Sequence, residues 1–200
     1  MLFNLFDWVG TFAFAVSGIR LAASKNFDWF GAFIVGLVTA IGGGTLRDMM
    51  LNIPLFWIGE PHYFIITFIA LIFTIIFKRY LVNINHSIFL FDSMGIALFT
   101  IMGIDKALEC ALDPWVAIVM GVTTACAGGV VRDILINETP LIFRKEIYAS
   151  ACLVGAVLYC VLLYFNVPLY IAKILPMSLI IIIRILAVKF NLNLPGLTKE

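Results

Sequence analysis

An arginine directly followed by an aspartate occurs twice in this chain, each time in apolar sequence and after a group of small residues. The first copy reads Gly-Gly-Gly-Thr-Leu-Arg-Asp over 42–48, and the second reads Ala-Gly-Gly-Val-Val-Arg-Asp over 127–133. Ionisable groups inside a membrane are costly, face a protein interior or an aqueous path, and usually pair. The two motifs therefore indicate a role in moving a charged solute. The alternative is that each Arg-Asp pair anchors a helix at the membrane interface.

Other polar groups lie within the apolar runs. Asp7 and Asp92 come early in two of the runs, where duplicated acids either attract cations or complement a helix N-terminus. Ser17, Thr39 and Thr124 lie deeper in their runs. They either line a pore or hydrogen-bond to their own helix backbone. We take all five as candidate pore-lining residues, together with the two Arg-Asp pairs.

The sequence carries no signal for catalysis. Its two histidines, His62 and His86, lie near the ends of apolar runs and lack the spacing of metal ligands. A nucleophile elbow, a phosphate-binding loop and a zinc pattern are all absent. We therefore predict that the protein is not an enzyme and has no catalytic residue, no metal site and no cofactor.

The elements that position these residues are predicted to be membrane helices. Of the 200 residues, 63% are hydrophobic and 12% are charged, whereas a typical soluble domain has about 45–50% apolar and about 25% charged residues. A spanning helix needs about 20 apolar residues. The net charge of +1 argues against a nucleic-acid partner. We predict an all-α integral membrane protein in the lipid bilayer, with seven transmembrane helices.

The seven apolar runs differ in length and in their ends. Strands are a poor interpretation, because the runs are too long and do not alternate. The third run is closed by Lys78 and Arg79, and the seventh is broken by Pro176. The runs cover about 5–19, 29–47, 63–77, 88–104, 115–131, 147–165 and 167–183.

An internal repeat with an offset of 85 residues joins the two halves of the chain. Residues 6–52 and 91–137 share 17 identities over 47 positions, including both Arg-Asp pairs. A one-residue insertion then aligns Pro54 with Pro140. Each copy holds three runs. Because three is odd, the second copy enters the membrane from the opposite side, which makes an inverted repeat.

We therefore predict a single transmembrane domain over residues 1–200. Repeat one covers about 5–83, repeat two covers about 88–165, and a seventh helix without a partner covers about 167–187.

Lysine and arginine are unevenly divided between the two sides of the predicted bundle. Of the 13 basic residues, 3 fall on the side of the N-terminus and 10 on the opposite side. Basic residues collect in cytoplasmic loops. This predicts an N-terminus outside and a C-terminus in the cytoplasm.

The apolar stretch over 29–57 is too long for one straight span. As a continuous helix it would be about 43 Å long, against a hydrocarbon thickness of about 30 Å. It should tilt, kink, or break and re-enter. The glycines either supply the kink or pack helices closely. The expected kink residues are Gly42, Gly43, Gly44, Gly128 and Gly129.

Neighbouring residues on a helix point about 100° apart and do not face each other. The repeat therefore suggests crossed ion pairs between its two copies. We expect Arg47 to pair with Asp133 and Arg132 to pair with Asp48.

The two three-span repeats, the two glycine-rich Arg-Asp motifs and the unpaired seventh span resemble the prokaryotic trimeric intracellular cation (TRIC) channel family. Bacterial members of that family also carry a proposed glycine-transporter label. The resemblance covers essentially the whole chain. Ala127 departs from a triple glycine, so the second kink is expected to be stiffer. The Lys-Glu-Val lipid-binding motif of animal members is absent, so phosphoinositide regulation does not transfer.

The resemblance implies a homotrimer with an ion path through each protomer, between the two repeats and beside the kinked second and fifth helices. It implies conduction of a monovalent cation, chiefly potassium, as the permeant ion. The alternative function is secondary transport of a small zwitterion such as glycine. The resemblance places the helix kinks on the five glycines named above. The candidate pore-lining or gating residues come from the sequence pattern and are Arg47, Asp48, Arg132, Asp133, Asp7, Asp92, Ser17, Thr39 and Thr124.

Overall fold

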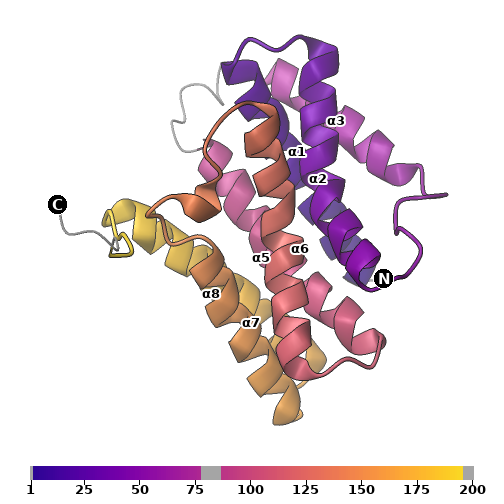
Figure 1. Ribbon diagram of the computed structural model, residues 1–200, viewed down its shortest axis with the longest axis vertical. Coiled ribbons are helices and arrows are strands. Elements are labelled where there is room, and N and C mark those ends of the chain that lie inside the picture. Colours follow the sequence, from indigo (N-terminus) through magenta and orange to yellow (C-terminus); the bar gives the residue numbers. More distant parts are fainter. Residues whose placement is uncertain (1, 78–86, 196–200) are drawn as a thin grey trace.

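The computed structural model describes residues 2–77 and 87–195. Lys78, Arg79 and Lys199, which the count of basic residues used, lie outside that part of the chain. The described residues form α-helices joined by short loops, with one short 3-10 helix (Figure 1). The helices are α1 (Leu2–Ser24), α2 (Trp29–Met50), α3 (His62–Ile76), α5 (Ser87–Glu109), α6 (Pro114–Leu135), η1 (Leu141–Phe143), α7 (Ala149–Tyr164) and α8 (Leu169–Lys189).

The seven predicted helices are confirmed, but they fall into two classes of length. Five are long and apolar enough to cross a membrane, namely α1, α2, α5, α6 and α8. The third helix of each repeat is shorter, with 15 residues in α3 and 16 in α7. At about 1.5 Å per residue these two measure roughly 22–24 Å, less than the hydrocarbon thickness of about 30 Å.

Neither α2 nor α6 breaks at its glycines, so of the three alternatives the break with re-entry is wrong, while the kink stays a prediction. Each runs without interruption for 22 residues, which is about 33 Å and fits one span. The apolar stretch over 29–57 was too long because it contains a helix and a loop. The helix ends at Met50, and Asn52 then takes a left-handed backbone with φ 52°.

The predicted break at Pro176 is also wrong, because α8 continues through this residue. A proline removes one backbone N–H from a helix, and packing against neighbouring helices tolerates this in membrane segments. Pro176 is buried, and its carbonyl faces Gly155 of α7. The close approach of the two helices therefore supports the continuous helix.

The repeat extends to the details of the backbone. Asn52 and Asn137, an offset of 85 residues apart, both take positive φ just after α2 and α6. Asn26 and Ala111 are related in the same way before those helices, with φ 61° and 56°. Positive φ is uncommon for residues other than glycine. The two copies therefore share their turns as well as their helices.

The centre of the bundle is built from α1, α2, α5 and α6 (Figure 1). Phe14 and Phe99, equivalent residues of the two repeats, stack with ring centroids 5.2 Å apart. Gly10 lies against Phe99, and its equivalent Gly95 lies against Phe14. These reciprocal contacts place a pseudo-two-fold axis at the phenylalanine pair, as an inverted repeat requires.

The glycines of α2 and α6 let these helices touch backbone to backbone. A Cβ at Gly43 would lie 1.9 Å from the carbonyl oxygen of Thr124, and one at Gly128 would lie 2.3 Å from that of Thr39. Thr39 of α2 meets Gly128 of α6, and Gly43, further along α2, meets the earlier residue Thr124. The two helices therefore cross in antiparallel directions. Small residues are used this way where membrane helices approach closely.

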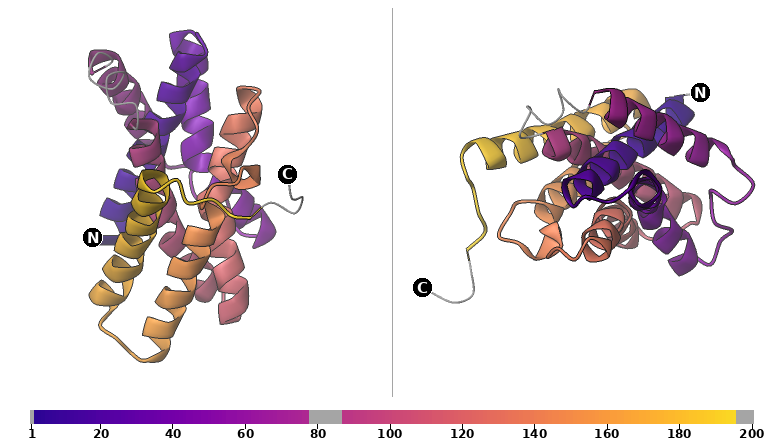
Figure 2. Two further views of the ribbon diagram at one scale, coloured as in Figure 1. Left: turned by 90° about the vertical axis from the view of Figure 1, so that its left-hand side faces the viewer. Right: turned by 90° about the horizontal axis from the view of Figure 1, so that it is seen from above.

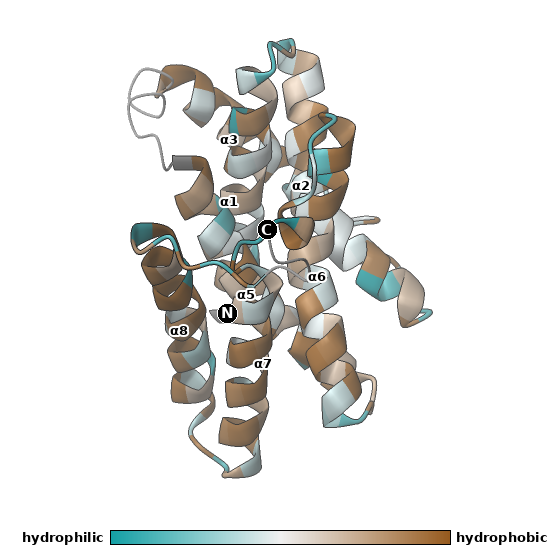
Figure 3. Ribbon diagram, turned by 60° about the vertical axis from the view of Figure 1, so that its left-hand side comes forward, coloured by the Kyte–Doolittle hydropathy of each residue, from teal (hydrophilic) through white to brown (hydrophobic). Residues whose placement is uncertain are grey.

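The seventh helix, α8, packs on α5 and α7 outside the central bundle (Figure 2). Lys173 of α8 lies 2.6 Å from Asp105 of α5, and Tyr159 of α7 donates to the same carboxylate. A single carboxylate thus ties three helices together. The outward surfaces of α7 and α8 are strongly hydrophobic (Figure 3).

Candidate functional site: two mouths and their arginines

Two cavities lie at equivalent places in the two repeats. The first mouth, of about 110 Å³, contains Arg47, Phe56, Lys106 and Glu109 in its lining. The second mouth has a volume of about 420 Å³. Its lining includes the repeat equivalents of those four residues, which are Arg132, Leu141, Leu21 and Ser24 in the same order. The pseudo-two-fold axis therefore generates two openings, each with an arginine of an Arg-Asp motif in its wall.

The α2–α6 crossing separates the two arginines. Because Thr39 meets Gly128 and Gly43 meets Thr124, Arg132 lies level with the part of α2 near residue 35. That is 12 residues before Arg47, or about 18 Å along the helix. An arginine side chain does not span this distance.

The expected crossed pairs are therefore wrong. Arg47 donates twice to its own neighbour, Asp48 Oδ1, from Nε at 2.8 Å and from Nη2 at 2.7 Å. Arg132 Nε likewise donates to Asp133 Oδ1 at 2.8 Å. The long arginine side chain curls back over its helix, so a 100° offset between neighbours does not prevent pairing.

In each repeat, the segment that follows the helix holds the aspartate of the Arg-Asp pair through a backbone N–H. Asp48 Oδ2 accepts from the backbone N–H of Phe56 at 2.8 Å, and Asp133 Oδ2 accepts from that of Leu141 at 3.0 Å. Both bonds reach eight residues ahead. The 85-residue offset therefore continues through these loops, without the insertion that the prolines suggested.

Arg132 has two further partners. Its Nη1 lies 2.6 Å from Asp92 Oδ1 and 2.9 Å from Ser17 Oγ. Arg132 and Asp92 are each 1% exposed. This ion pair is desolvated and joins α6, α5 and α1 at one point. Breaking such a pair leaves an uncompensated buried charge.

The equivalent acid of repeat one, Asp7, has a different partner. Its Oδ2 accepts from Tyr63 Oη at 2.7 Å, and His62 Nε2 lies 3.9 Å away. No hydrogen bond joins Asp7 to Arg47 in the described residues. Instead, the Arg47 guanidinium lies 5.6 Å from the centre of the Phe56 ring. Ser17 accepts from Arg132 at the second mouth, whereas the equivalent residue beside Arg47 is Met102, whose thioether is only a weak acceptor.

The remaining candidates lie between the mouths. Thr39 and Thr124 are fully buried, and each hydroxyl donates to its own helix, to Val35 and Met120 respectively, at 2.6 Å. The structure thus brings Asp7 and Arg47 to the first mouth and Arg132 and Asp133 to the second. Asp48 is fully buried against Arg47, and Asp92 lines a separate cavity beside the second mouth. It places the threonines at the helix crossing.

Sequence reasoning missed several residues of the site. Tyr63 was not singled out, although Tyr148 lies exactly one repeat offset further on. Carrying the comparison past the prolines without a gap would have exposed this pair. Nothing in the sequence pointed to Lys25, Glu138 and Arg144, which form an ion-pair chain at the rim of the second mouth.

An ion pair between Lys25 of repeat one and Glu138 of repeat two joins the repeats at the rim of the second mouth. The hydrogen bond from Lys25 and its charge, with a smaller contribution from Arg144, lower the pKa of the Glu138 carboxyl. Glu138 also lies 3.2 Å from Arg144. The carboxylate is therefore ionised when it holds the 25–28 loop to the segment after α6.

Metal-ligating side chains do not gather in this site. Across residues 2–77 and 87–195, no group of three or more His, Cys, Asp or Glu side chains could hold a metal ion. The polar groups of the mouths are instead mutually paired charges, an arrangement suited to a passing ion or solute.

Comparisons with known proteins agree with this architecture. The sequence model of a family described as "Glycine transporter" matches twice, over residues 4–79 and 89–164. The UPF0126 inner membrane protein YadS of Escherichia coli K12 is 38% identical over 198 residues, which is 98% of this chain and 96% of that protein.

Solved structures give the same result. The TRIC trimeric intracellular cation channel orthologue from Rhodobacter sphaeroides has a TM-score of 0.90 at 35% identity, covering 96% of this chain and 99% of that one. A second structure, from work on conductance through TRIC cation channels, has a TM-score of 0.88 at 32% identity and covers 100% of this chain and 99% of the other. Similarity at this level extends to the whole fold.

Proposed function

Because the chain belongs to the glycine transporter (UPF0126) family and has the fold of prokaryotic TRIC channels, we propose that it conducts monovalent cations. The path runs through each protomer between the two inverted repeats, and potassium is the main permeant ion. The observation that carries this proposal is the pair of mouths related by the repeat, with an arginine–carboxylate pair in each wall.

The local pairs resolve an apparent contradiction. A bare arginine would repel cations from the path. Asp48 and Asp133 each accept from the adjacent arginine at 2.7–2.8 Å, so each arginine is neutralised where it stands. Asp7 and Asp92 then add negative charge beside the two arginines, which favours a cation over an anion.

The region between the mouths is closed in this structure. Phe14 stacks on Phe99, and the backbones of α2 and α6 touch at Gly43 and Gly128. Conduction therefore requires the two helices to separate or bend. We assign this movement to the glycine clusters at 42–44 and 128–129, which weaken the helix and allow a kink on opening.

The setting of the channel follows from the same relatives and from the basic residues. We place it in the bacterial inner membrane, as the name of the E. coli relative describes. The N-terminus lies outside and the C-terminus in the cytoplasm, as the charge count predicts. The assembly is a homotrimer, in line with the trimeric description of the R. sphaeroides orthologue. Within each protomer the domain divides into repeat one, repeat two and the seventh helix near the limits predicted above.

A second function is favoured by one specific observation. Two cavities open at equivalent places of an inverted repeat and are separated by a closed centre, which is also the architecture of alternating-access transporters. The family's description as glycine transporters names a matching substrate. Secondary transport of a small zwitterion such as glycine is therefore the alternative.

Single-channel recording in planar bilayers tests the proposal directly. The purified protein should give discrete unitary currents under a potassium gradient. Arg47→Gln and Arg132→Gln should change open probability or conductance, while Lys189→Gln, an equal charge change on the exposed end of α8, should not. Stoichiometric, saturable glycine uptake into liposomes without unitary currents would favour the transporter. Currents identical in both arginine variants and the parent would contradict the assigned path.

A further inference from the structure

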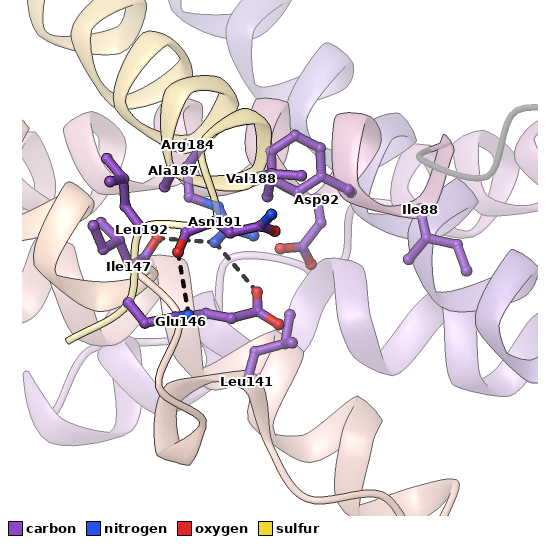
Figure 4. Close-up of a pocket in the computed structure, with 12 residues that line it drawn as sticks. Ile88, Asp92, Leu141, Glu146, Ile147, Arg184, Ala187, Val188, Asn191 and Leu192 are labelled. Carbon is purple, nitrogen blue, oxygen red and sulfur yellow. Dashed lines mark hydrogen bonds and ion pairs between the residues drawn. The ribbon is translucent and has the colours of Figure 1, made fainter. Parts of the chain in front are cut away.

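A third cavity, of about 390 Å³, lies beside the helix that the repeat leaves out. It sits between the start of α5, the end of α8 and the segment before α7 (Figure 4). Ile88 and Leu141 line both this cavity and the second mouth, so the two are neighbours. Its polar lining comes from Asp92, Glu146, Arg184, Asn191 and Asn193.

Arg184 is the most buried charge of this cavity outside the proposed path. It is 1% exposed, yet its Nε has no hydrogen-bond partner in the described residues. Its Nη1 donates to the Ile147 carbonyl at 2.9 Å and lies 3.6 Å from Glu146 Oε2. The guanidinium also lies over the rings of Phe89, at 4.8 Å, and Tyr148, at 5.0 Å. These contacts fix the guanidinium and leave the buried Nε–H without a partner in the described residues.

A second residue that lines the same cavity has an unused acceptor. Asp92 Oδ1 is taken by Arg132, but Asp92 Oδ2 is buried without a partner in the described part of the chain. A buried polar atom without a partner is unfavourable by about 1–3 kcal/mol, and by more when it belongs to a charged group. An unpartnered donor and an unpartnered acceptor in the lining of one cavity therefore indicate a ligand that carries both kinds of group.

The charges around the cavity narrow the class of that ligand. Arg184 and Arg132 contribute two positive charges. Asp92, Asp133 and Glu146 contribute three negative charges. A simple anion would meet a net charge of −1, and a simple cation would leave the Arg184 donor unused. A zwitterion satisfies both.

We propose that this cavity binds a small zwitterion, with its ammonium group on Asp92 Oδ2 and Glu146 and its oxyanion on Arg184 Nε. The amides of Asn191 and Asn193 supply further donors and acceptors. Two sources share this chemistry: the headgroup of an ethanolamine phospholipid and a free amino acid. The inference does not rest on cation conduction, because Asp92, Glu146 and Arg184 line this cavity and neither of the two mouths, although the charge of Asp92 also acts on the neighbouring path.

The position of the cavity is compatible with both sources. It lies where α5 begins and α8 ends, which is the level of the lipid headgroups for a spanning helix. Ile185 and Leu186, which follow Arg184 on α8, are exposed and offer an apolar surface for acyl chains. The cavity volume also accommodates a small amino acid, since one water occupies about 30 Å³ of liquid.

Binding measured on the full-length protein in nanodiscs tests the proposal. One arm uses phosphatidylglycerol nanodiscs and measures saturable binding of radiolabelled glycine. The other arm adds phosphatidylethanolamine and measures retained lipid by native mass spectrometry. Saturable binding in either arm is expected and identifies the source. Arg184→Gln should weaken that binding at least 10-fold, while Lys189→Gln, five residues further along α8 and exposed, should leave it unchanged.

A second variant keeps the test decisive if Arg184→Gln does not fold. Val188→Phe adds volume to the cavity wall and leaves every charge in place, so it should also abolish binding. Absence of saturable binding in both arms would overturn the proposal. Binding that survives in Val188→Phe, or in a folded Arg184→Gln, would overturn it as well. Unitary potassium currents recorded from the same preparations report on conduction separately, so the two proposals fail independently.

Discussion

Arg132 Nη1 lies 2.6 Å from Asp92 Oδ1, whereas Arg47, the equivalent arginine of the other repeat, makes no such bond to Asp7. Tyr63 takes the place of the arginine and donates to Asp7 at 2.7 Å. Duplicated residues thus have different partners in the two copies. The two mouths are chemically unequal, and substitutions at equivalent positions should have unequal effects.

The arginines provide the first comparison. Arg132→Gln leaves Asp92 and Asp133 buried without their cation, so it should lower the free energy of unfolding by about 3–5 kcal/mol. Arg47→Gln removes a pair with Asp48 alone and should cost less. Thermal unfolding of the two variants in the same detergent measures the difference. An equal loss in both, or a larger loss for Arg47→Gln, would contradict the inequality of the mouths.

The tyrosines provide the second comparison. Tyr63→Phe removes the donor to the buried Asp7 carboxylate and should destabilise the protein by about 1–3 kcal/mol. Tyr148→Phe is the matched control, because its hydroxyl is buried without a partner in the described residues. Removing an unsatisfied hydroxyl should be neutral or slightly stabilising. Chemical unfolding of both variants checks this order, and a greater loss for Tyr148→Phe would refute it.

The glycines can be separated into packing and bending roles. Gly43→Ala and Gly128→Ala place a Cβ 1.9 and 2.3 Å from a backbone oxygen of the other helix. Each should destabilise the protein by about 1–3 kcal/mol through overpacking. At Gly42 the nearest atom would be 3.6 Å away, so Gly42→Ala should fold normally.

Gly42→Ala is therefore informative in single-channel recordings. If the glycine cluster bends during opening, the stiffer helix should reduce open probability without loss of stability, because alanine raises helix propensity by about 1 kcal/mol over glycine. An unchanged open probability would remove bending at Gly42 from the proposed mechanism.

The rim of the second mouth should respond to acid. The pKa of Glu138 is lowered in the folded protein, chiefly by the hydrogen bond from Lys25. The contribution of this ion pair to stability is therefore complete above the ordinary glutamate pKa of 4.5 and is lost as the pH falls through the lowered value.

Melting temperatures measured across this pH range test that sign. Since the pair is exposed, the effect should be small and should shrink in high salt. Glu138→Gln should abolish the part of the pH dependence that salt suppresses. An unchanged pH profile in that variant would assign the titration to another group.

Much of the fold could be predicted from the amino-acid sequence alone. The scarcity of charge and the length of the apolar runs predicted membrane helices, because only long apolar segments match the hydrocarbon thickness. The 85-residue offset predicted an inverted repeat, because a copy with three spans must reverse its direction. The same offset paired Asp7 with Asp92 and Arg47 with Arg132 as equivalent residues.

Helix limits and contact partners could not be read in this way. The apolar stretch over 29–57 did not reveal that its helix ends at Met50, because the loop that follows is equally apolar. The symmetric spacing suggested crossed pairs. The antiparallel crossing at Gly43 and Gly128 instead separates Arg47 from Arg132 by about 18 Å along the helix axis.

The sequence by itself therefore determined the membrane class, the duplicated architecture and the identity of the charged residues within the apolar runs. These follow from composition and spacing, which folding does not alter. Only the tertiary structure decided that Arg132 donates to Asp92 while Tyr63 donates to Asp7. It also decided that Arg184 lines a third cavity, apart from the two mouths. The reason is physical: a hydrogen bond depends on distance and direction to about an ångström, and packing between helices sets those quantities.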